Sequence, residues 1–165
     1  MSEDPRAGAR ALTPDELERL VLDLAGLPDA WRHLVGHRPD ARTYVELRRD
    51  RDVAVWLICW MDDHDTGYHD HDLSAGAVAV TRGAVREERL VVGGSPATRT
   101  AAAGEAFTFG PADIHRVSHV GDAPAVTIHA YSPPLWRMGA YEVLDSGVLQ
   151  RWSLSYADEL RPIGA

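Results

Sequence analysis

Two stretches of the chain, HDHDLSAGAVAVTRG (residues 69–83) and GEAFTFGPADIHRV (residues 104–117), carry most of the information about its architecture. In a β-strand, residues i and i+2 point to the same face, so His69 and His71 are expected to project together while Asp70 points away. Two adjacent imidazoles can bind one metal ion, and a third ligand must come from elsewhere in the sheet. His115 is the leading candidate, because it follows a Gly-Pro turn at the start of a predicted strand.

Four further histidines are interpreted without a role as ligands. His64 lies among Asp62, Asp63 and Asp65, and this segment is predicted to be a solvated acidic loop. An isolated histidine of this kind is more often incidental than a ligand. The same interpretation applies to His33, His37 and His119.

Short β-rich segments, separated by Gly, Pro and Asp clusters, surround the two stretches. They predict strands at residues 53–60, 75–83, 85–92, 105–110, 115–120 and 125–132, with two more near 140–144 and 148–156. Many short strands with turn signals and little helix are typical of a sandwich or barrel. We therefore expect a mainly β protein built on one small antiparallel barrel.

The chain before residue 50 has a different pattern. Residues 1–11 are small and charged, which predicts a disordered tail. Thr13 and Glu16 can form a capping box around Pro14, which predicts the start of a helix. A second short helix is predicted over residues 28–35, with Trp31 and Leu34 facing the core. The expected organisation is a single domain over residues 12–165, with N-terminal helices at 12–50 and the β-barrel at 51–165.

Composition excludes several classes of function. The 165 residues carry a net charge of −8, which argues against binding to nucleic acid or to an anionic membrane. All basic residues are arginine, so Schiff-base chemistry and a phosphate-binding Walker lysine are excluded. One cysteine, Cys59, permits no internal disulfide, and no signal peptide or apolar run of membrane length is present. The predicted location is the cytoplasm.

The two histidine stretches resemble the two sequence motifs of the cupins, in which HxH on one strand and a histidine on a later strand bind a metal inside a small barrel. The cupin glutamate position holds Gly76 here, while the closing glycine is present as Gly83. A site without the glutamate resembles the three-histidine cysteine dioxygenase family. The segment AVTIHAYSPPL (residues 125–135) is similar to the Ser-x-His-x-Tyr-Ser-Pro-Pro segment of that family.

This resemblance implies a cupin fold and an Fe(II)-dependent thiol dioxygenase, whose partners are a small thiol and O2 and whose product is a sulfinic acid. It implies that His69, His71 and His115 bind the iron. It also implies a hydrogen-bonded relay beside the iron, formed by Thr127, His129 and Tyr131, with the Tyr131 hydroxyl next to the metal and the substrate. Apart from the resemblance, Trp60 is a further candidate for contact with the substrate. The cysteine that forms a thioether to this tyrosine in animal members falls at Gly76, so that bond cannot form. Cys59 is expected to be a buried structural thiol.

The identity of the thiol stays open at this point. Members specific for cysteine bind its carboxylate with an arginine, and that position falls near Val45 or Glu46 here. A nearby arginine (Arg42, Arg48 or Arg49) could replace it. Alternatively, Glu46 and the acids at 62–65 would suit a cationic thiol or thione such as ergothioneine, packed against Trp60, Tyr44 or Trp136.

A second class of function also stays open. The chain could be a cupin isomerase that depends on a metal, or a cupin that binds a small molecule without catalysis. The absence of the glutamate at Gly76, combined with the Thr127-His129-Tyr131 pattern, favours the dioxygenase. The sequence does not specify the oligomeric state.

Overall fold

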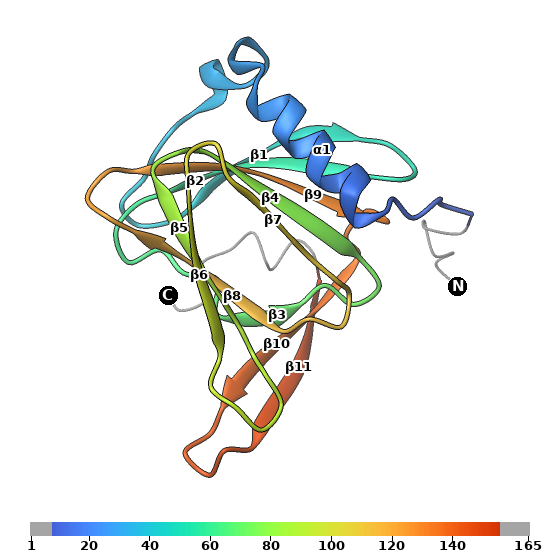
Figure 1. Ribbon diagram of the computed structural model, residues 1–165, viewed down its shortest axis with the longest axis vertical. Helices are drawn as coiled ribbons and strands as arrows, with labels where there is room; N and C mark the ends of the chain where they lie inside the picture. The colour runs from blue at the N-terminus through green and yellow to red at the C-terminus, as the bar shows by residue number, and fades with distance from the viewer. Residues whose placement is uncertain (1–7, 156–165) are drawn as a thin grey trace.

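Two antiparallel β-sheets face each other in the computed structural model, which describes residues 8–155 (Figure 1). The first sheet has the strand order β1-β2-β9-β4-β7, and the second has the order β11-β10-β3-β8-β5-β6. Along the chain the strands are β1 (Thr43–Arg49), β2 (Ala54–Trp60), β3 (Tyr68–Asp70), β4 (Ala75–Arg82), β5 (Ala84–Arg89), β6 (Ala97–Ala102), β7 (Ala106–Phe109), β8 (His115–Val120), β9 (Ala125–Ser132), β10 (Arg137–Val143) and β11 (Leu149–Ser155). The predicted mainly β cupin architecture is confirmed.

Side chains that alternate along the central strands form two hydrophobic clusters, one between the sheets and one on the outer face of the first sheet. On β2, Ile58 and Trp60 point between the sheets, whereas Leu57 and Cys59 point to the outer face of the first sheet. Both faces of the sheet are buried along these strands, so β2 is a continuous apolar run. On β9 the apolar Val126, Ile128 and Ala130 face the outer side, and the polar side chains between them face the space between the sheets. The predicted burial of Cys59 is confirmed.

Helix α1 (Pro14–Ala25) covers the outer face of the first sheet (Figure 1). The predicted capping box is present: the Thr13 hydroxyl accepts from the Glu16 N–H, and the Glu16 carboxylate accepts from the Thr13 N–H. Leu17 and Val21 are fully buried against the sheet. The helix thus shields one side of the barrel from solvent.

The N-terminal segment differs from its prediction at two places. Two short 3₁₀ turns, η1 (Pro28–Ala30) and η2 (Arg32–Leu34), replace the predicted second helix. Trp31 is buried as expected, and its indole N–H donates to the Leu24 carbonyl at 2.9 Å. Leu34 is only half-buried.

The boundary predicted between helices and barrel at residue 50 is wrong, because residues 43–49 form β1 and pair with β2. β1 lies at the edge of the first sheet, so it can carry exposed Glu46, Arg48 and Arg49. These charges hide the strand pattern in the sequence. β6, with its short exposed side chains at the edge of the second sheet, was also not predicted. Of the predicted tail, residues 1–7 lie outside the described residues.

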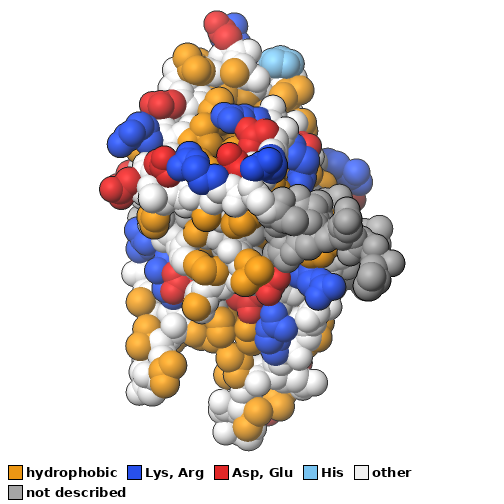
Figure 2. Space-filling view, turned by 90° about the vertical axis from the view of Figure 1, so that its right-hand side faces the viewer, with side chains coloured by type: hydrophobic (Ala, Val, Ile, Leu, Met, Phe, Trp, Pro, Cys, Tyr) orange, Lys and Arg blue, Asp and Glu red, His pale blue; other side chains and the backbone are white. Residues whose placement is uncertain are grey.

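Two hairpins project at the end of the molecule away from α1, one from β5 and β6 and the other from β10 and β11 (Figure 1). Figure 2 shows hydrophobic side chains on both projections. The groove between them has a volume of about 810 Å³ and is lined by apolar residues such as Val91, Val92 and Leu149. Its described lining contains no histidine. Within residues 8–155, no helix is long and apolar enough to cross a membrane.

Candidate metal centre

Strands β3 and β8 bring three histidines together inside the barrel. His69 on β3 is the register partner of His115, the first residue of β8, and His71 follows directly after β3. One ring nitrogen from each of His69, His71 and His115 lies within 4.8 Å of the other two. The Nε2 atoms of His69 and His71 are 3.2 Å apart, and all three side chains are buried. The structure therefore brings together the three residues predicted as ligands.

The imidazoles of His69 and His71 present lone pairs rather than charges to the space between the three rings. Burial lowers the pKa of His69 and of His71 well below the ordinary value, and the neighbouring imidazoles lower them further. Nδ1 of His69 lies 2.9 Å from the Gly67 carbonyl, so it must carry the proton and donate. Nε2 of His69 is then an acceptor that faces Nε2 of His71. A cluster of buried imidazole nitrogens fits a divalent metal ion.

A buried carboxylate supports the third ligand from outside. His115 Nδ1 lies 2.8 Å from Oε1 of Glu87 on β5, so it donates there and directs Nε2 inward. Burial raises the pKa of Glu87, but the hydrogen bonds from His115, Arg89 and Arg99 outweigh it and lower the pKa to about 2. Glu87 is therefore ionised and supplies a negative charge one hydrogen bond away from the histidine cluster.

The segment between the two paired histidines is anchored in the opposite direction. Asp70 points away from His69 and His71, as the alternation predicts. Its carboxylate accepts from the Gly139 N–H at 2.9 Å and from the Tyr141 hydroxyl, both on β10. This anchor ties β3 to the neighbouring strand and fixes the register of the histidine pair.

A hydrogen-bonded chain runs beside the histidines along β9. The Trp60 indole N–H donates to Thr127 Oγ1 at 2.8 Å, and Thr127 Oγ1 lies 2.8 Å from Nε2 of His129. Nδ1 of His129 lies 3.3 Å from the Tyr131 hydroxyl. Burial, with the charge of Arg42, lowers the pKa of His129 to about 3, so this ring is neutral. A neutral imidazole has one donor and one acceptor nitrogen, so His129 connects Thr127 with Tyr131 in a single direction of donation.

Trp60 therefore lies at the end of the relay that is farther from the cavity, and not between the relay and the cavity. Its side chain is fully buried, and its indole N–H is used by Thr127. The guanidinium of Arg42 lies 5.2 Å from the centre of its ring. The described residues that line the cavity at the histidines include Tyr131 but not Trp60.

Arg42 lines the cavity together with the three histidines, His129 and Tyr131. Two other arginines considered from the sequence form ion pairs on the surface: Arg48 with Asp50, and Arg49 with Glu46. The lining that the structure describes contains no carboxylate, so Arg42 supplies its fixed charge. Glu46 and the acids at 62–65, which were expected to suit a cationic thiol, are not among the residues described in this lining.

The segment around His64 is not the solvated loop that the sequence predicted. The His64 side chain is buried; its Nδ1 accepts from the Met61 N–H at 2.9 Å, and Nε2 lies 3.2 Å from the Pro39 carbonyl. Asp65 pairs with Arg116. A histidine can replace missing backbone partners in a tight loop, and hydropathy alone does not reveal this. The prediction that His64 is not one of the clustered ligands agrees with the geometry.

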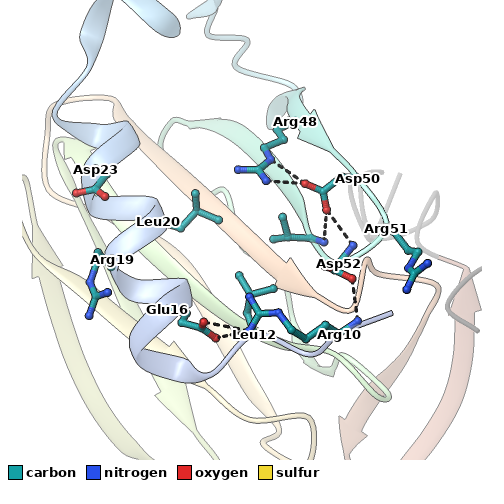
Figure 3. Close-up of a pocket in the computed structure, with 11 residues that line it drawn as sticks. Arg10, Leu12, Glu16, Arg19, Leu20, Asp23, Arg48, Asp50, Arg51 and Asp52 are labelled. Carbon is teal, nitrogen blue, oxygen red and sulfur yellow. Dashed lines mark hydrogen bonds and ion pairs between the residues drawn. The ribbon is translucent and has the colours of Figure 1, made fainter. Parts of the chain in front are cut away.

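A second cavity, larger than the one at the histidines, lies on the outer side of the first sheet, between α1 and the turn that joins β1 to β2 (Figure 3). Its volume is about 410 Å³, and arginines and carboxylates line it in equal numbers. Many of these charges pair with each other, as Arg10 does with Glu16 and Arg48 with Asp50. The residues described around it include no histidine or cysteine, whereas the histidine cluster lies in the smaller cavity inside the barrel.

Fold and site together define the class: this is a cupin with a buried three-histidine site that indicates a metal cofactor. The sequence profile described as "Cysteine dioxygenase type I" matches residues 10–143. The chain belongs to the cysteine dioxygenase type I family. A comparison with curated protein sequences finds no match to this chain.

Solved structures share the fold at low sequence identity. The protein TT1209 from Thermus thermophilus gives a TM-score of 0.54 at 17% identity, covering 62% of this chain and 93% of that protein. A cupin superfamily protein from Desulfitobacterium hafniense gives 0.53 at 10% identity, with 62% and 87% covered. An oxalate oxidase gives 0.51 at 17% identity, with 59% and 54% covered. These similarities concern the fold.

Proposed function

We propose that this protein is an Fe(II)-dependent thiol dioxygenase in which His69, His71 and His115 bind the iron. The observation that carries the proposal is the convergence of three buried histidine side chains beside the Thr127-His129-Tyr131 relay, in a cavity whose described lining contains no carboxylate. Imidazole ligands suit iron, and a neutral ligand set favours an anionic substrate ligand such as a thiolate.

When bound, Fe(II) supplies open coordination positions at which a thiolate sulfur and O2 can meet. The overall reaction, RSH + O2 → RSO2H, balances without a further reductant, because the sulfur supplies all the electrons that O2 accepts. The chain positions these partners and controls their protons. Tyr131 is the last residue of the relay, and its hydroxyl is proposed to hold or deliver a proton at the reacting oxygen or sulfur. Burial of the site excludes bulk water.

Arg42 supports a substrate that carries a carboxylate. A guanidinium binds a carboxylate through two parallel hydrogen bonds, a geometry that an ammonium group cannot use. Its cation also disfavours a quaternary ammonium in the same cavity, and its position against Trp60 covers the ring face expected to receive one. We therefore propose a thiol that carries a carboxylate and no quaternary ammonium, such as cysteine or 3-mercaptopropionate, in preference to the cationic alternative considered from the sequence.

An oxygen-uptake assay on iron-loaded protein tests the proposed activity. The panel is L-cysteine, 3-mercaptopropionate, cysteamine and ergothioneine, each at equal iron loading. We expect uptake with L-cysteine and 3-mercaptopropionate, and a sulfinic acid as product. A protein that binds iron but consumes no O2 with any thiol would instead be a cupin isomerase or a non-catalytic binding protein.

Arg42→Gln is expected to lower kcat/KM for the preferred anionic thiol by roughly 10- to 100-fold. A hydrogen bond to a charged group contributes roughly 1.5–3 kcal/mol, and each 1.4 kcal/mol is about tenfold. The loss should appear mainly in KM, because Arg42 is proposed to hold the substrate rather than the reacting atoms. Steady-state kinetics for L-cysteine and cysteamine check this, since cysteamine has no carboxylate to lose. Arg48→Gln is the surface control, and equal losses for both thiols would contradict the assignment.

Glu87→Gln is expected to weaken metal binding by roughly 10- to 100-fold, the range seen when the hydrogen-bond partner of a ligating histidine is changed. The amide keeps the shape of the side chain but removes its charge, and with it the charge-assisted bonds from His115, Arg89 and Arg99. Competition with a chelator measures the affinity. Glu88→Gln, at the next position on β5, is the control and should bind metal as the unmodified protein does.

A further inference from the structure

The three clustered imidazoles are not held in the same way. His69 donates from Nδ1 to the Gly67 carbonyl, and His115 donates from Nδ1 to Glu87. Nδ1 of His71 is buried and has no hydrogen-bond partner among the described residues. A ligating histidine almost always has its ring plane fixed by a hydrogen bond from the second nitrogen. Something other than a hydrogen bond must orient His71.

The ring of Phe109 packs directly against His71. The two ring centres are 4.4 Å apart and the planes are inclined by 26°, which is a stacked arrangement. Phe109 also lies 4.5 Å from the ring of His115. Tyr131 lies 5.2 Å from His71, at a larger inclination of 34°. Stacking with an aromatic ring restricts rotation of an imidazole, because rotation would break the contact between the two faces.

Gly76 makes room for this phenylalanine. Gly76 on β4 is the register partner of Phe109 on β7. A Cβ atom at residue 76 would lie 2.2 Å from Cζ of Phe109 and 2.9 Å from the Ala130 carbonyl oxygen. A side chain at residue 76 is therefore incompatible with the observed position of the Phe109 ring. The sequence shows Gly76 only as a departure from the cupin pattern. The structure gives a steric reason for it, because the Phe109 ring occupies the space that a side chain would need.

We infer that Phe109 is a positioning residue, which fixes the imidazole plane of His71 by stacking and which fits because residue 76 is glycine. The inference rests on the proposed function in one respect, namely that His71 binds a metal. Phe109 itself donates nothing to the metal. It replaces, for His71, the hydrogen bonds that hold His69 and His115.

The test replaces the Phe109 ring by another apolar side chain, so that the core stays filled. Phe109→Leu keeps an apolar side chain but removes the stacking partner. Phe107→Leu is the matched control, because Phe107 lies two residues earlier on β7 and is also buried. Its ring contacts Arg99 instead, whose Cζ atom lies 5.0 Å from the ring centre of Phe107. Phe109→Met is the second non-aromatic variant, to be used if the leucine variant does not fold. Co(II) alone is the probe, since its visible absorption reports the geometry of its ligands.

Two readouts separate positioning from general packing. We expect both leucine variants to lower Tm by similar amounts. Phe109→Leu should in addition weaken Co(II) binding roughly tenfold, measured by competition with a chelator, at the lower end of the range for residues that support a ligand. Its Co(II) spectrum should also change. Phe107→Leu should keep both the affinity and the spectrum of the unmodified protein.

Several outcomes would overturn the inference. Unchanged Co(II) affinity and spectrum in Phe109→Leu or Phe109→Met would show that stacking does not orient His71. Equal changes in Phe107→Leu would assign the effect to core packing. If the unmodified protein bound neither Co(II) nor Fe(II), the proposed metal site and this inference would both fail. If it bound metal but oxidised no thiol, the proposed reaction would fail while the Phe109 comparison kept its meaning.

Discussion

His71→Ala is expected to abolish most iron binding and nearly all thiol oxidation. The substitution removes one of three nitrogen ligands and leaves two imidazoles, His69 and His115, too few to hold a ferrous ion firmly. The loss should exceed the roughly 10- to 100-fold that follows from changing a residue which only supports a ligand. Metal analysis after reconstitution and gel filtration gives the iron content per chain.

The control for this substitution is His119→Ala. His119 lies on β8, four residues after His115, and is not part of the histidine cluster. It should keep the iron content of the unmodified protein. If His71→Ala retained full iron content while folded, His71 would not be a ligand and the three-histidine assignment would be wrong.

Tyr131→Phe is expected to bind iron normally and to lose on the order of 10²- to 10⁴-fold in kcat. Only the hydroxyl is removed, and groups that transfer or hold a proton in the transition state contribute about this much. The ring of Tyr131, which packs 5.2 Å from the ring of His71, remains in place. Iron content, kcat and KM should be measured on the same preparation.

The control for Tyr131→Phe is a tyrosine that lies outside the relay. Tyr44→Phe is the matched control, because Tyr44 packs against Trp56 and takes no part in the Thr127-His129-Tyr131 chain. Its turnover should not change. If Tyr131→Phe turned over at the rate of the unmodified protein, the Tyr131 hydroxyl would have only a structural role.

The histidine cluster could be predicted because its signal is local. His69 and His71 are two residues apart, and a turn before a strand marks His115. Both features follow from the geometry of strands and do not need knowledge of the tertiary structure. The strand pattern of the barrel is equally local for β2, whose side chains are apolar, and for β9, where apolar and polar side chains alternate. It is weak for β1 and β6, where an edge position allows charged or small exposed residues.

Glu87 could not be singled out, because its role depends on pairing between distant segments. It lies 28 residues from His115 in the sequence, and the antiparallel pairing of β5 with β8 brings the two together. A partial signal exists: Val85 and Glu87 alternate on one strand and both are buried, so an acid occupies an inward position. Such an acid needs cationic or donor partners, and the sequence does not show which ones.

Arg42 and Phe109 illustrate a different limit. Comparison with a family motif places the carboxylate-binding arginine by counting residues, and this chain has none in that register. The structure brings Arg42 into the cavity from the segment before β1, which counting residues along the motif does not indicate. For Phe109, the decisive contact is steric, between a ring on β7 and the glycine opposite it on β4.

The most direct test of the central claim is the fate of oxygen in a single product. Protein loaded with Fe(II) under anaerobic conditions is mixed with L-cysteine or 3-mercaptopropionate and isotopically labelled O2, and the product is analysed by mass spectrometry. The proposed function predicts a sulfinic acid in which both oxygen atoms carry the label, at a rate that depends on bound iron. Unlabelled oxygen in the product, or a disulfide as the main product, would contradict it.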